Sequence, residues 1–353
     1  MSRGERSAPG RTEDAEARAF RRSTFKKGST TYFNSSLFFP ADVRAKVFIL
    51  YAFVRRADDF VDAVPQDGEG FRAFRAYAEA RLSPESAAAA YAGPAHTATA
   101  RATPATPARE PPAHTATARA TPVREPPARG ASDDAVQAAS SGVQPEDQRV
   151  VDDFVDLARK EGFDPLWTRA FLDSMEADLH RAAYDTLEDT LGYIYGSAEV
   201  IGLFMSRLMG LPVESFQAAR LLGRAMQYIN FIRDVAEDRT LGRRYLPLNG
   251  FDPRVVEPEW AQGHEAQFSD WLRSHLGLYR RWQEEALAGF PLIPYRYRIA
   301  VAAAADMYWW TAAAIERNPL VVFEKKVKPR RFRIYSAILR NAMMGAVFPP
   351  RRA

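Results

Sequence analysis

The chain has 353 residues, of which 46% are hydrophobic and 26% charged, and it contains no cysteine. This composition predicts a globular protein with a sizeable core, and it excludes disulfide frameworks, thiolate zinc sites and cysteine nucleophiles. The formal net charge is only +4, and we expect no nucleic-acid partner. The N-terminal segment lacks an apolar core, and the most apolar later stretch, residues 299–315, contains Asp306 and is too short to span a bilayer. We therefore expect a cytoplasmic protein.

Most of the chain is expected to be helical, because Ala, Leu, Arg and Glu are abundant and apolar residues recur every three to four positions. Several of the helices are apolar around most of their circumference, which is typical of the centre of an all-α domain. The predicted helices cover residues 41–63, 71–81, 148–161, 166–182, 186–209, 214–239, 265–288 and 295–318, and a basic helix follows Pro329.

Residues 83–147 interrupt this pattern. They are rich in Ala, Pro, Thr and Arg, and the decapeptide AHTATARATP occurs twice, at 95–104 and 113–122. Proline is too frequent for a helix, and large apolar residues are scarce, so burial could not offset the loss of conformational entropy. The sequence predicts a disordered insertion of 83–147 in one domain that spans 1–353.

The pentapeptide DDFVD occurs twice, at 58–62 and at 152–156. In either copy the i and i+4 carboxylates lie on one helix face and could hold a divalent cation. Around the second copy, apolar residues occupy one side and acids the other, which indicates an ordinary surface helix. The helix before the first copy is apolar on nearly every side, so Asp58 and Asp62 require compensating charge. Arg55 supplies part of it.

A second acidic stripe lies on the helix predicted for residues 214–239. An arc of about 80° on an ideal helical wheel contains Gln227, Asn230, Asp234 and Asp238. Two such stripes on apolar helices predict a cavity in which carboxylates face one another. Hard oxygen ligands suit Mg²⁺, with Mn²⁺ as a substitute, and phosphate oxygens commonly complete the coordination. Nearby arginines suit a diphosphate. A nucleotide is not expected, because no glycine-rich phosphate loop is present.

Four segments together resemble the squalene and phytoene synthase family, whose members join two prenyl diphosphates head to head. They are GSTTYFNSSLFFP at 28–40, YAFVRRADDFVD at 51–62, YIYGSAEVIGL at 193–203 and YINFIRDVAEDRTLGRRYLP at 228–247. The resemblance covers nearly the whole chain except 83–147. It implies a single isoprenoid-synthase-type helical domain, all-α, with a central cavity.

The resemblance also implies roles for individual residues. Asp58, Asp62, Asp234 and Asp238 would bind Mg²⁺. The residues that would orient the diphosphate groups are Arg55, Gln227, Asn230 and Arg233. The residues that would border the reacting carbons are Ser29, Tyr51, Tyr193 and Tyr308. Residues deep in the channel that could select chain length are Phe48, Ser197, Ile201 and Phe204.

The residues of these motifs resemble those of the phytoene branch of the family. This resemblance implies that two geranylgeranyl diphosphates form phytoene through a cyclopropylcarbinyl diphosphate, and that NADPH is not used. A dehydrosqualene or squalene synthase that uses farnesyl diphosphate is the alternative. A helical scaffold without catalytic activity is the remaining one. It is expected to have lost acids from one motif, and all four are present.

The C-terminal residues 325–340 are basic, and Phe323, Phe332, Ile334, Tyr335, Ile338 and Leu339 add large apolar side chains in and just before this segment. Two interpretations stay open: an amphipathic helix that associates peripherally with a membrane surface, or a helix that packs on the domain. The sequence does not give the oligomeric state.

Overall fold

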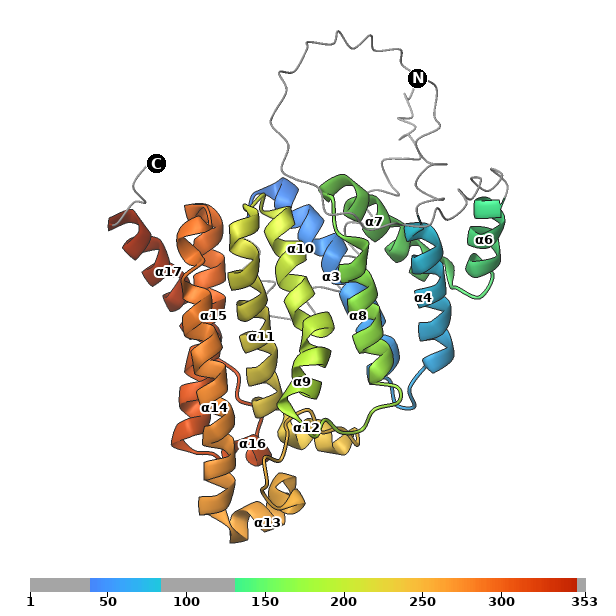
Figure 1. Ribbon diagram of the computed structural model, residues 1–353. Helices are drawn as coiled ribbons and strands as arrows, with labels where there is room; N and C mark the ends of the chain where they lie inside the picture. The colour runs from blue at the N-terminus through green and yellow to red at the C-terminus, as the bar shows by residue number, and fades with distance from the viewer. Residues whose placement is uncertain (1–38, 84–130, 348–353) are drawn as a thin grey trace, which may run out of the picture.

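A computed structural model of the chain describes residues 39–83 and 131–347 (Figure 1). Within these two ranges the fold is all-α. No β-strand occurs in them, and the backbone has one isolated bridge, between Ala183 and Arg244. None of the helices described is long and apolar enough to cross a membrane.

The described helices belong to two parts of the chain, before and after residues 84–130. In chain order they are α3 (Ala41–Asp62), α4 (Gly68–Leu82), α6 (Ala131–Ser140), α7 (Pro145–Glu161), α8 (Pro165–Ala177), α9 (Leu187–Ile194), the π-helical turn η1 (Tyr195–Glu199), α10 (Val200–Leu208), η2 (Val213–Ser215), α11 (Phe216–Arg233), α12 (Val235–Thr240), η3 (Pro253–Val256), α13 (Pro258–Gly263), α14 (Glu265–Leu287), η4 (Phe290–Leu292), α15 (Tyr295–Arg317), α16 (Val321–Glu324) and α17 (Arg331–Val347). In Figure 1, α11 lies inside the bundle and α17 at its edge.

The predicted helices are confirmed, with differences at their ends, a π-helical turn inside the one predicted for 186–209 and a break inside the one predicted for 214–239. Proline opens α7 and α8, and Gly162, with a φ of 64°, ends α7 in the left-handed conformation that glycine adopts at low cost. A capping box at Thr186 begins α9. The helix predicted for 214–239 is interrupted at Asp234, where φ is −101° and ψ is 15°, so that α11 and α12 are separate.

The predicted insertion of 83–147 is too long at its C-terminal end. Helix α6 and the first turn of α7 both lie inside that range. Val143, Asp147 and Val150 are buried against the domain, and Asp147 pairs with Arg56 of α3. These contacts supply the burial that composition alone did not indicate. Residues 84–130 lie outside the described part of the chain.

The second DDFVD copy lies on α7, as predicted for a surface helix. Val151, Phe154 and Val155 are buried against the rest of the domain, and Phe154 stacks on Phe53 of α3 with ring centroids 3.8 Å apart. Asp152 accepts hydrogen bonds from the Tyr77 hydroxyl at 3.0 Å and from Arg81 Nε at 2.7 Å. This copy therefore serves packing between α7 and α4.

Two large apolar clusters form the core. The first joins α3, α4, α7, α8 and α10, and the second joins α9, α11, α14 and α15. Glycines let α11 approach the η1–α10 helix closely where the clusters meet: a Cβ on Gly223 would lie 2.5 Å from the Ala198 carbonyl oxygen, and one on Gly202 would lie 2.3 Å from the Ala219 carbonyl oxygen. Both glycines also line the cavity that separates the clusters.

Candidate functional site

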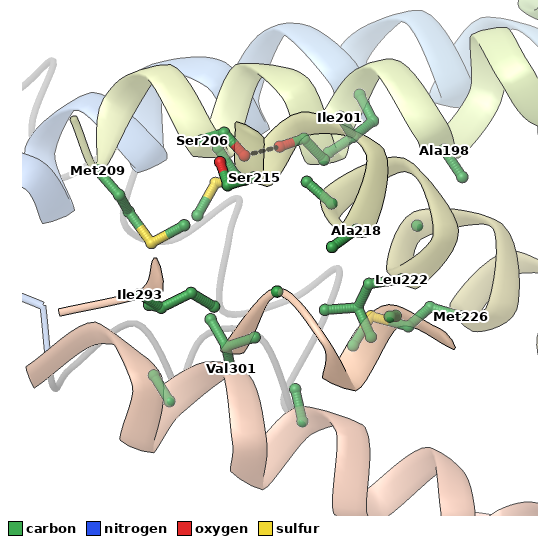
Figure 2. Close-up of a pocket in the computed structure, with 18 of the residues that line it drawn as sticks. Ala198, Ile201, Ser206, Met209, Ser215, Ala218, Leu222, Met226, Ile293 and Val301 are labelled. Atoms are coloured by element: carbon green, nitrogen blue, oxygen red, sulfur yellow. Dashed lines mark hydrogen bonds between the residues drawn. The ribbon is translucent and has the colours of Figure 1, made fainter. Parts of the chain in front are cut away.

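A largely apolar cavity of about 320 Å³ lies between α3, the η1–α10 helix, α11, η4 and α15. Its volume falls in the range of small-molecule pockets, roughly 300–1,000 Å³. In Figure 2, Ile201 of α10 and Ala218, Leu222 and Met226 of α11 reach it from one side, and Val301 of α15 faces them. Even the hydroxyl of Ser206 is internally satisfied, since it donates to the Gly202 carbonyl oxygen at 3.0 Å. Such walls suit long hydrocarbon chains.

Polar side chains also line the cavity: Tyr51, Ser197, Gln227, Asn230 and Tyr308. The Asn230 amide donates to Gln227 Oε1 at 3.4 Å, whereas Asn230 Oδ1 and Ser197 Oγ are buried without a hydrogen-bond partner in the described structure. Buried polar atoms normally have partners, so these two oxygens indicate a ligand with donors or positive charge.

The first acidic motif begins two helical turns beyond Tyr51 on α3. Arg55 pairs with Asp58 at 2.8 Å and with Asp59 at 2.6 Å. The Asp58 side chain keeps 35% of its accessible surface, but the protein around it is dense. Burial, followed by repulsion from Asp62, raises the pKa of Asp58 to about 7. Arg55 therefore neutralises this set of acids only in part, as expected from the sequence.

The second acidic motif begins one turn beyond Asn230. Arg233 pairs with Asp234 through two hydrogen bonds, of 2.8 and 2.5 Å, and Lys326 lies 3.4 Å from the same carboxylate. Asp238 has no ion-pair partner in the described part of the chain. Burial, followed by repulsion from Asp234, raises the pKa of Asp238 to about 8.

Arg243 joins the two motifs. Its guanidinium donates to Asp62 Oδ1 at 2.9 Å and to the Val61 carbonyl oxygen at 2.6 Å, at the end of α3. Its backbone amide donates to the Asp238 carbonyl oxygen at 2.8 Å. A smaller cavity of about 220 Å³ beside Asp238 is also lined by Arg239, Arg243 and Arg244. The four acids predicted from two separate stripes thus border one region that is rich in both signs of charge.

Carboxylate and amide oxygens are the kind of donor that the expected magnesium would take, with phosphate oxygens as further ligands. In residues 39–83 and 131–347, no three acidic or histidine side chains converge closely enough to hold a metal ion alone. Arginines pair with Asp58, Asp62 and Asp234, whereas Asp238 has no ion-pair partner among these residues. Carboxylate oxygens and the unpartnered Asn230 Oδ1 are hard ligands of the type that Mg²⁺ binds together with substrate phosphates.

Tyr193 does not line the cavity. It is buried, and its hydroxyl donates to Asp178 Oδ2 at 2.7 Å, while the Tyr245 hydroxyl donates to Asp178 Oδ1 at the same distance. Phe231 stacks on Tyr245 with ring centroids 4.3 Å apart. Sequence reasoning missed Asp178, because MEADLH carries no recognisable signal, and it did not single out Tyr245, which follows the arginine pair in the second motif.

The remaining predicted residues have varied positions. Ser29 lies outside the described residues. Ser197 and Ile201 line the cavity, as predicted for residues that select chain length. Phe204 does not, because it packs against Phe154, Phe163 and Trp167 in the first apolar cluster, and its predicted place in the channel is wrong.

The chain is similar in sequence to known proteins. The profile of the family described as Squalene/phytoene synthase matches residues 25–333. A phytoene synthase from Pseudescherichia vulneris is 31% identical over 158 residues, which cover 44% of this chain and 51% of that protein. A 4,4'-diapophytoene synthase from Staphylococcus haemolyticus is 31% identical over 118 residues, 31% of this chain and 41% of that protein. The chain thus spans about half the length, or less, of these relatives.

The fold agrees with solved structures as well. A crystal structure of a dehydrosqualene synthase in complex with ligand superposes with a TM-score of 0.66 at 19% identity, and the match covers 96% of this chain and 99% of that one.

Proposed function

We propose that this chain, which belongs to the squalene/phytoene synthase family, condenses two geranylgeranyl diphosphates head to head into phytoene in carotenoid biosynthesis. The observation that carries this proposal is the junction of an apolar cavity with two acidic motifs and their arginines. An apolar tail and a diphosphate head need those two environments side by side. The name of the bacterial relative supports the twenty-carbon substrate.

Each part of the site has a role in this proposal. Asp58, Asp62, Asp234 and Asp238 would hold Mg²⁺, which supplies positive charge to the departing diphosphate. Arg55 and Arg233 would exchange their aspartate partners for phosphate oxygens, because guanidinium groups bind both in the same bidentate way. Gln227, Asn230 and Tyr51 line the cavity and would orient the head groups.

The reaction then needs protection from water. The allylic C–O bond breaks, the double bond of the second prenyl chain attacks the resulting cation, and a cyclopropylcarbinyl diphosphate forms with loss of a proton. Loss of the second diphosphate, rearrangement and a final loss of a proton give the joined triene. The apolar walls of α10, α11 and α15 would exclude water, which would otherwise capture each cation. No NADPH is required for this outcome.

The two copies of DDFVD offer a matched test. Asp62→Asn is expected to lower kcat/KM by roughly 100-fold or more, because it weakens binding of the Mg²⁺ that would neutralise the leaving group. Asp156→Asn alters the same position of the same pentapeptide on the surface of α7 and is expected to leave activity unchanged. Purified protein would be incubated with geranylgeranyl or farnesyl diphosphate and Mg²⁺ without NADPH, and extracted lipid analysed by chromatography and ultraviolet spectra.

The outcomes separate the alternatives. A triene from geranylgeranyl diphosphate supports phytoene synthesis. Product from farnesyl diphosphate alone moves the proposal to dehydrosqualene, and the name of the staphylococcal relative, a diapophytoene synthase, agrees with that alternative. Product that appears only after NADPH is added indicates squalene. Full activity of Asp62→Asn would refute the metal assignment, and no product under any condition would favour a scaffold without catalysis.

A further inference from the structure

Helix α17 packs on the domain through one face. Ile334, Ala337 and Ile338 are buried against Ala303 and Met307 of α15. The Asn341 amide donates to Asp306 Oδ2 at 2.7 Å, and Arg340 pairs with the same carboxylate at 2.7 Å. The packing interpretation of the basic C-terminal helix is thus confirmed for this inner face.

The outer face of α17 carries a second apolar stripe. Phe332 is 83% exposed, Tyr335 55% and Leu339 60%. On an ideal wheel these three positions lie within about 60°, and the buried positions lie in a separate arc. A helix that only packs on its own domain has no need of large side chains on both faces. In Figure 1, α17 lies at the edge of the bundle, with α15 on its inner side.

Positive charge accompanies this outer stripe. Arg333 is exposed and lies about 100° from Phe332 on the wheel, while the exposed Arg340 beside it pairs with Asp306. Three further cations, Lys325, Lys328 and Arg330, are exposed on the segment that leads into α17. Arg333 also covers the Trp310 ring, 5.0 Å from its centroid. Apolar side chains beside a basic margin match a membrane surface, where acyl chains lie beneath anionic headgroups.

We propose that the outer face of α17, formed by Phe332, Tyr335 and Leu339, binds the surface of an anionic lipid bilayer. The inference does not depend on the proposed reaction, since it rests on exposure and charge outside the cavity. It has a consequence for that reaction: α15 lines the cavity with Val301 and Ala304 and carries α17 on its other side. The membrane would then lie one helix away from the oily contents of the cavity.

Flotation of the full-length protein with vesicles tests the proposal. Binding is expected to vesicles in which phosphatidylserine replaces part of the phosphatidylcholine, and to weaken with phosphatidylcholine alone or at raised salt. Phe332→Gln/Leu339→Gln should lower the partition coefficient roughly tenfold or more. The matched control is Leu166→Gln/Val213→Gln, because these side chains are 61% and 64% exposed on other elements, and it should bind as the parent does.

A second measurement uses the absence of cysteine from the chain. A polarity-sensitive dye on Ser336→Cys, which is exposed beside the stripe, should shift to shorter wavelength when anionic vesicles are added. The same dye on Ser141→Cys, exposed between α6 and α7, should not.

Equal vesicle binding by the two double variants, no binding by the parent, or equal dye shifts would overturn the proposal. A Phe332→Gln/Leu339→Gln variant that loses self-association in size-exclusion chromatography but floats as before would also overturn it, because the face would then contact protein.

Discussion

The Asp178 carboxylate should couple energetically to the two tyrosines that donate to it. Asp178→Asn keeps the shape of the side chain but removes its charge. Each phenol contact is 2.7 Å long, and a hydrogen bond to a charged group contributes about 1.5–3 kcal/mol, against about 0.5–1.5 kcal/mol for a neutral pair. Loss of charge should therefore weaken each contact by about 1 kcal/mol.

Burial acts in the opposite direction. It is the largest influence on Asp178 and raises its pKa, while Arg243 and the two tyrosines lower it. Since Asp178→Asn also relieves this desolvation, we expect it to destabilise the fold by only about 1–2 kcal/mol. The coupling energy is the cleaner quantity, because desolvation of the carboxylate cancels from a double-mutant cycle.

The assay is urea unfolding of Asp178→Asn, Tyr193→Phe, Tyr245→Phe and the double variants. Each Asp–Tyr cycle should give a coupling energy of about 1 kcal/mol. Tyr184→Phe is the control. Tyr184 lies in the same aromatic cluster, with its ring centroid 5.2 Å from that of Tyr193, but its buried hydroxyl has no hydrogen-bond partner in the described structure. Additive effects in both cycles, or equal coupling for Tyr184, would refute the reasoning.

Three further predictions concern packing, pH and buried charge. Gly223→Ala should lower stability by about 1–3 kcal/mol, since its Cβ would meet a backbone oxygen at 2.5 Å, whereas Gly192→Ala, with nothing within 4 Å, should stabilise by up to about 1 kcal/mol in the same thermal melts. Burial lowers the pKa of His275 from 6.5 to about 4, so the unfolded chain takes up a proton that the folded chain does not. The free energy of unfolding should thus fall by about 1.4 kcal/mol for each pH unit from about pH 6.5 down to about pH 4. When it is measured by urea unfolding at several pH values, its slope against pH should be smaller for His275→Gln by this amount. Glu199 is 1% exposed and forms ion pairs of 2.7 and 2.8 Å with two arginines of α11. Glu199→Gln should therefore lower the free energy of unfolding by about 3 kcal/mol or more, whereas Asp270→Asn, at an exposed ion pair, should change the unfolding midpoint little.

Much of the fold was predictable because the helices are long, periodic and bounded by proline. The same reasoning failed where helices are short or lack a strong apolar pattern. Helix α6 has the composition of the Ala-rich stretch before it, and α13 and α16 have only six and four residues. Their stability comes from tertiary contacts, which a local pattern does not contain.

The site divides in the same way. On α3 the acids could be placed on one helix face, because spacing along a helix fixes direction, whereas Asp234 lies at the break between α11 and α12. The ion pair between Arg243 and Asp62 joins residues 181 positions apart. The hydrogen bonds of Tyr193 and Tyr245 to Asp178 require three separate segments of the chain to meet. Neither follows from spacing. The expected position of Tyr193 beside the reacting carbons came from resemblance alone, and its hydroxyl is turned toward Asp178 instead.

The π-helical turn η1 lies between Tyr193, which reaches Asp178, and Ile201, which faces the cavity. A π turn holds one residue more than an α-helical turn, and each residue rotates the chain by about 100°. Deleting one residue from 195–199 would leave a continuous helix but turn all of α10 by that angle relative to α9. Each residue of α10 would take the place of the one before it, so Leu203, now in the first apolar cluster, would turn toward the cavity in place of Gly202, and Ile201 would leave it. In this helix, the deletion of one residue would therefore change which side chains line the cavity.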